Sequence, residues 1–141
     1  MAEAIFSSAI AHVIQLAVAP VFVLTSVGAF LTVLTNRFGR IIDRSRKLEE
    51  QQAPDDKVLM ELAILKKRAA LINWAISLFT LGASFTCVMI ATLFIGDFLL
   101  FDASIAVASL FVLAMLCLIF GLLLFQREIY LAIRTMKIVS A

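Results

Sequence analysis

Small and polar side chains recur at helical spacing in two long uncharged stretches of this sequence. In a membrane, such residues let helices approach closely and exchange hydrogen bonds, and they can also line a water-filled path between subunits. Both interpretations stay open from the residues alone, although helix packing is the commoner use. The first stripe comprises Thr25, Gly28, Thr32, Thr35, Asn36 and Gly39, and the second comprises Ala70, Asn73, Ser77, Thr80, Ser84, Cys87 and Ala91.

A second group consists of six basic residues, which a reversal of the chain at Pro54 would bring to one height just below the inner headgroups. Their side chains can bind an anionic lipid or another anionic partner at a defined site. The alternative is a general orientation signal with ordinary lipid contact, since the bias of basic residues toward the cytoplasm already explains such a cluster. The six residues are Arg37, Arg40, Arg44, Lys66, Lys67 and Arg68.

A third group is expected at the opposite membrane surface and contains His12, Gln15, Asp97 and Asp102. A histidine that meets either aspartate can titrate near neutrality and act as a pH-sensitive polar site. The plainer interpretation is a helix-end histidine that is hydrogen-bonded to backbone or water.

The remaining chemistry-bearing residues give no catalytic pattern. The sequence has a single histidine, no second metal-ligand type spaced around it, no glycine-rich phosphate loop, and no acid inside the uncharged stretches. These are the groups from which hydrolases, kinases and metal sites are assembled. We therefore expect no enzyme activity, no metal and no cofactor.

The elements that must position these residues are membrane-spanning helices. Uncharged stretches cover residues 4–36, 69–96 and 103–126, and each exceeds the roughly 20 apolar residues needed to cross a hydrocarbon core. With 63% hydrophobic residues and a mean hydropathy of +1.08, a chain this short cannot bury its apolar surface in a soluble core. The expected fold is a single all-α membrane domain with three transmembrane helices, at about 12–36, 69–96 and 103–126.

The basic residues predict the orientation of these helices. Nine lie between the first two stretches and three follow the third, whereas the other side has none. Short loops rich in lysine and arginine stay in the cytoplasm. We expect the N-terminus outside and the C-terminus in the cytoplasm.

Apolar residues continue at intervals of three and four past the predicted inner surface. This spacing is typical of a paired helical seam and predicts a cytoplasmic antiparallel hairpin over residues 37–68, with Arg46 paired to Glu61 across it. Residues 127–141 are expected to form an amphipathic cytoplasmic tail, and the third span to face mostly lipid. The seam residues are Phe38, Ile41 and Leu48 on one arm and Val58, Leu62 and Leu65 on the other.

The segments His12–Phe22, Leu34–Arg37 and Arg40–Arg44 resemble a family of small bacterial membrane proteins of unknown function, DUF2721, and the likeness extends over nearly the whole chain. The resemblance implies a three-helix protein of the bacterial inner membrane and brings no known activity, ligand or site residues. It directs attention to the His12–Pro20 and Arg37–Arg44 segments.

These observations favour a homo-oligomeric scaffold or interaction component of the inner membrane. A small homo-oligomeric ion channel lined by a Thr, Ser and Gly stripe is the first alternative, and an anionic-lipid-binding regulator is the second. The expected partners are the bilayer, further copies of the chain and, as a candidate, an anionic lipid. No nucleic-acid partner is expected.

Overall fold

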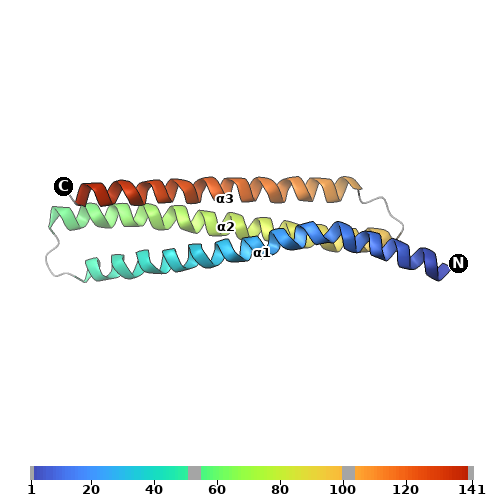
Figure 1. Ribbon diagram of the computed structural model, residues 1–141. Coiled ribbons are helices and arrows are strands. Elements are labelled where there is room, and N and C mark those ends of the chain that lie inside the picture. The colour runs from blue at the N-terminus through green and yellow to red at the C-terminus, as the bar shows by residue number, and fades with distance from the viewer. Residues whose placement is uncertain (1, 51–54, 100–103, 140–141) are drawn as a thin grey trace.

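The computed structural model describes residues 2–50, 55–99 and 104–139, with side-chain surroundings for 10–50, 55–96 and 104–134. These residues form three long helices, α1 (Ala2–Glu49), α2 (Asp56–Leu99) and α3 (Ser104–Val139), which lie lengthwise along one rod (Figure 1). Each helix is long and apolar enough to cross a membrane. The prediction of an all-α protein with three membrane-spanning helices is confirmed.

The helices run well past the uncharged stretches that predicted them. Pro20 removes one backbone hydrogen bond, yet α1 continues through it without interruption. At the far end, α1 reaches Glu49 and α2 starts at Asp56, so the basic segments that flank the spans are helical as well.

A heptad pattern of buried residues explains why the helices pack lengthwise. The most buried side chains of α1 recur at every seventh residue, as do those of α2, and the same spacing appears in α3. A strict seven-residue repeat keeps one face of each helix against its neighbours in a left-handed supercoil. The repeats are Val13, Pro20, Val27, Leu34, Ile41 and Leu48 in α1, Leu65, Ile72, Phe79 and Thr86 together with Ala75, Gly82 and Met89 in α2, and Ala114, Gly121 and Glu128 in α3.

The contact between α2 and α3 is more extensive than that between α1 and α2, and small residues meet in it. A Cβ atom added to Gly82 would lie 3.3 Å from the backbone oxygen of Ala114, and one added to Gly121 would lie 3.1 Å from the ring of Phe79. Much of the surface of α3 is exposed within one chain, and that this surface faces lipid stays a prediction. Its few small residues lie in the contact with α2, where glycine leaves room for the neighbouring helix.

The helix α2 contacts both of its neighbours, whereas α1 and α3 do not approach each other closely within the described residues. Beyond the membrane-spanning part, Ile41, Leu48 and Leu65 are buried in the same core cluster as the intramembrane residues. Glu61 pairs with Arg44 at 2.9 Å, not with Arg46 as the sequence predicts. Arg44 lies one heptad after Arg37, on the side of α1 that meets α2.

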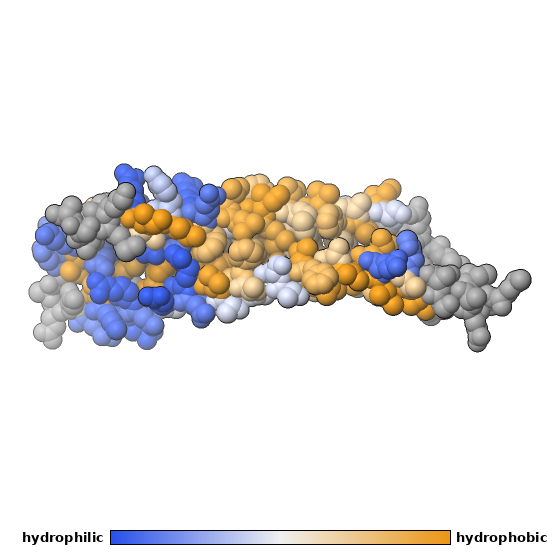
Figure 2. Space-filling view, viewed as in Figure 1, coloured by the Kyte–Doolittle hydropathy of each residue, from blue (hydrophilic) through white to orange (hydrophobic). Residues whose placement is uncertain are grey.

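Hydrophilic side chains gather at one end of the rod, which contains the α1–α2 connection and the end of α3 (Figure 2). The middle of the visible face is predominantly hydrophobic, with a pale patch of intermediate hydropathy. The protein is thus a multi-pass membrane protein with one strongly charged end, which we call the basic end.

Candidate anion-binding site

A buried carboxylate joins all three helices at the basic end. Glu128 occupies the heptad position of α3 that follows Gly121, and its side chain has no exposed surface. Its Oε1 accepts hydrogen bonds from Nε of Arg68 at 3.0 Å and Nη2 of Arg68 at 2.8 Å. Its Oε2 lies 3.0 Å from Nη2 of Arg37. One acid from α3 therefore binds one arginine from α1 and one from α2.

The two arginines are held in different ways. Arg68 directs two donors at a single carboxylate oxygen, and only 17% of its side chain is exposed. Arg37 contacts the other oxygen as an ion pair without an aligned hydrogen bond, and its guanidinium also lies 5.6 Å from the ring centroid of Phe125. Two positive charges share one negative charge, so this cluster keeps a net charge of +1.

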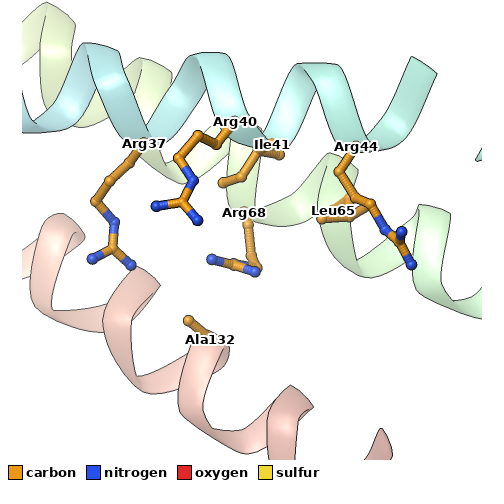
Figure 3. A pocket seen from close by; sticks show the side chains of 7 residues that line it. All are labelled: Arg37, Arg40, Ile41, Arg44, Leu65, Arg68 and Ala132. Carbon is orange, nitrogen blue, oxygen red and sulfur yellow. The ribbon is translucent and has the colours of Figure 1, made fainter. Parts of the chain in front are cut away.

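A pocket of about 480 Å³ opens beside this cluster, between the three helices. Figure 3 shows Arg40 and Arg68 extending into the space, Arg37 reaching toward α3, and Arg44 at the far rim. We call this cavity the arginine pocket. Its lining residues are Arg37, Arg40, Ile41, Arg44, Leu65, Arg68 and Ala132.

Every charged residue that lines the arginine pocket is an arginine. Arg37 and Arg68 share Glu128, and Arg44 binds Glu61, but no acid in the described part of the chain pairs with Arg40. Guanidinium groups present planar pairs of donors that match the oxygens of a phosphate or carboxylate. The pocket can therefore bind an anion chemically, and Arg40 is its arginine without an acidic partner in the described part of the chain.

The structure brings together four of the six basic residues that the sequence singled out, and leaves out two. Lys66 is exposed and lies 3.3 Å from Glu49, while Lys67 is exposed and does not line the pocket. Sequence reasoning missed Glu128, because it assigned the residues after Gln126 to a surface tail. The available signal was the heptad that runs from Ala114 through Gly121 to Glu128.

The polar stripes lie on the outer faces of their helices. The stripe members Thr25, Gly28, Thr32, Thr35 and Asn36 on α1, and Asn73, Ser77, Thr80 and Ser84 on α2, are all exposed. Most of their hydroxyl groups donate to the backbone oxygen four residues earlier in the same helix, as Thr32 does to Gly28 at 3.0 Å and Ser77 does to Asn73 at 3.0 Å. The two stripes therefore do not meet each other within one chain.

Of the predicted outer polar site, the structure describes the two side chains on α1 but neither aspartate side chain. His12 and Gln15 are exposed near the start of α1. The side chain of Asp97 and all of Asp102 lie outside the described residues. Whether the histidine meets an aspartate stays a prediction.

Comparison with known proteins identifies a family. A family model described as a protein of unknown function, DUF2721, matches residues 17–138. This range includes every residue of the arginine pocket and the buried Glu128. Searches of curated proteins and of solved structures found no match.

Proposed function

The chain belongs to the DUF2721 family, whose function is unknown, and from its geometry we propose that it binds the phosphate headgroup of an anionic lipid in the arginine pocket. The role is non-catalytic, and the membrane is the bacterial inner membrane. The N-terminus lies outside and the C-terminus in the cytoplasm, because the basic end carries the arginine and lysine excess that stays inside. The observation that carries the proposal is the pocket whose charged lining is all arginine.

The height of the pocket favours a lipid over a soluble anion. Arg37 is the first charged residue after the uncharged part of α1, and the other pocket arginines of that helix follow within seven residues. At a rise of 1.5 Å per residue, the pocket lies within about 10 Å of the end of the apolar span. Headgroup phosphates of the inner leaflet occupy this depth, where basic pockets between helices bind them.

The positions of the two arginines at Glu128 support binding of an anion at a defined site, rather than a general attraction of anionic lipids to a basic surface. A carboxylate with no exposed surface holds the guanidinium of Arg68 in place by two hydrogen bonds. Preorganised donors lose less rotamer freedom when a ligand binds. The negative charge of Glu128 offsets part of the repulsion among the arginines, so they can stay together without a ligand.

Replacement of Arg40 by glutamine is expected to weaken binding of phosphatidylglycerol about tenfold, because it removes the charge-assisted donor that no acid of the described residues competes for. Lys67→Gln is the matched control, since it removes the same charge from an exposed residue that does not line the pocket. Binding is measured by native mass spectrometry of protein released from nanodiscs that contain phosphatidylglycerol and phosphatidylcholine.

Equal losses in the two variants would show a general basic belt and would contradict a defined site. A second arm of the experiment replaces the lipid with glycerol phosphate in solution. If the soluble phosphate binds to the wild-type protein as tightly as the lipid does, the natural ligand is a free phosphate compound and the lipid assignment is wrong.

A second candidate function, assembly with further copies of the chain, is favoured by the exposed stripes. Asn73 carries a carboxamide near the inner end of the span of α2, and this side chain has no hydrogen-bond partner within the described residues. An unpartnered amide is costly in an apolar environment, and a neighbouring copy can supply its partner. A homo-oligomeric scaffold buries the stripes in dry helix contacts, whereas a small channel turns one stripe toward water.

Replacing Asn73, Ser77 and Thr80 together by leucine is expected to weaken self-association roughly tenfold, because each interhelical hydrogen bond adds a fraction of a kcal/mol. Mass photometry in nanodiscs measures the subunit number. Ser109→Leu on the exposed face of α3 serves as the control and leaves the assembly intact. A monomer in the wild type contradicts assembly, and ion flux into liposomes favours the channel over the scaffold.

A further inference from the structure

We propose that an acyl chain of the bound lipid lies in an apolar groove between α1 and α3, so that the site holds a whole anionic phospholipid. This inference rests on the proposed function, because the headgroup in the arginine pocket supplies the anchor. The groove has a volume of about 230 Å³ and lies on the membrane-spanning part of the helices. The residues that carry the argument are Val23, Ser26, Val27, Phe30, Phe79 and Leu118.

The groove and the arginine pocket lie on the same side of the bundle. Each of these six groove residues has a counterpart in the pocket that is fourteen residues nearer the basic end of its own helix. Fourteen residues are two heptads, and heptad positions keep one face along a supercoiled helix. The pairs are Val23 with Arg37, Ser26 with Arg40, Val27 with Ile41, Phe30 with Arg44, Phe79 with Leu65 and Leu118 with Ala132.

The distance between the arginine pocket and the groove matches the length of a phospholipid in one leaflet. Fourteen helical residues span about 21 Å at a rise of 1.5 Å per residue. One leaflet contributes about half of the roughly 30 Å hydrocarbon core, and the headgroup region adds several ångströms. A lipid with its phosphate in the arginine pocket therefore reaches the groove with the distal part of its acyl chain.

Between the two hollows lies a stretch of surface on the same side of the bundle. Leu34 is fully buried below it, and the Arg37 side chain lies over Phe125. Val33, halfway between Ser26 and Arg40 on the same face of α1, is 47% exposed. The acyl chain thus crosses an apolar surface at Val33 before it enters the groove.

The shape of the groove favours an acyl chain over a helix from a second copy. A helix is about 10 Å wide with its side chains, whereas the groove is a small hollow with fully buried Phe79 at its floor. Because the groove is aligned with the arginine pocket, the molecule that fills both must also carry a negative charge at one end. A phospholipid satisfies both requirements in a single molecule.

The test uses a variant whose new side chain fills the groove and leaves the arginine pocket unchanged. In Ser26→Trp, the indole is expected to occupy the groove and to weaken binding of dipalmitoyl phosphatidylglycerol about fivefold, because packing contacts drive association inside the bilayer. Binding of dihexanoyl phosphatidylglycerol, which is too short to reach the groove, is expected to stay at the wild-type level. Val21→Trp places the same side chain on an exposed part of α1 outside the groove and is the control.

The outcomes separate the two proposals. If Arg40→Gln weakens both lipids while Ser26→Trp weakens neither, headgroup binding stands and the acyl-chain inference is overturned. If neither variant affects either lipid, the proposed function itself fails. A change of subunit number in Ser26→Trp, with long-chain lipid binding intact, assigns the groove to a second copy and also overturns the inference.

Discussion

Replacement of Glu128 by leucine lowers the free energy of unfolding by about 3 kcal/mol, because removing one partner of a buried ion pair leaves uncompensated charge behind. Arg68 then points its two donors at an apolar side chain, and Arg37 loses its contact with α3. Unfolding by sodium dodecyl sulfate in mixed micelles, followed by the fluorescence of Trp74, the single tryptophan, measures the change.

Two controls identify the cause of this loss. Glu61→Leu removes the partner of Arg44, but both side chains are substantially exposed, so its effect is expected to stay below about 1 kcal/mol. Replacing Arg37, Arg68 and Glu128 together by methionine is expected to recover most of the stability, since an apolar substitute for a buried ionic cluster is often neutral. A triple variant as unstable as Glu128→Leu would show that the ion pairs are not the cause.

Substitution of Gly82 or Gly121 by leucine is expected to destabilise the bundle by about 2 kcal/mol through overpacking of the α2–α3 seam. At Gly82, the backbone oxygen of Ala114 at 3.3 Å from the added Cβ cannot rotate away. At Gly121, the obstacle is the ring of Phe79, which is buried and stacked on Phe30 with centroids 5.4 Å apart. The same unfolding titration in mixed micelles measures both variants.

Gly28→Leu, compared in the monomeric protein, is the matched control for these substitutions. A Cβ atom at Gly28 meets nothing within 4 Å, and exposed substitutions away from special features usually change stability by less than about 0.5 kcal/mol. Equal destabilisation at Gly28 and Gly82 would mean that loss of glycine in the helix, and not helix approach, determines the effect.

The three spans could be predicted from sequence because absence of charge over a long stretch is a local property. Residues 4–36, 69–96 and 103–126 each fall within one observed helix, apart from residue 103, which lies outside the described residues. Burial follows the heptads of large residues in α1, such as Leu34 and Ile41. This pattern is also visible in the sequence once the repeat is known.

The buried carboxylate could not be predicted in the same way, because its environment depends on which helix faces meet. Glu128 stands between Arg127 and Ile129 in a segment with several basic residues, and a surface acid among bases is the ordinary interpretation. Only the docking of α3 on α2 at Gly82 and Gly121 places it beside Arg68. Local charge pattern carries no information about that contact.

The stripes illustrate a different limit of sequence reasoning. Thr32 and Thr35 on α1, and Ser77 and Thr80 on α2, share a face of their helix as the spacing predicts. Hydroxyl groups that bond to their own backbone can face either a neighbouring helix or lipid. The face was therefore predictable, but the direction in which it points within the bundle was not.

Because α1 and α3 do not approach each other closely within the described residues, α2 is the helix that holds them together. The backbones of these helices are held apart by α2 along their length, and the ion pair between Arg37 and Glu128 is their electrostatic link at the basic end. Separating α1 from α3 therefore requires breaking the packing of one of them against α2. Glu128→Leu therefore removes the direct link between α1 and α3 as well as the charge balance.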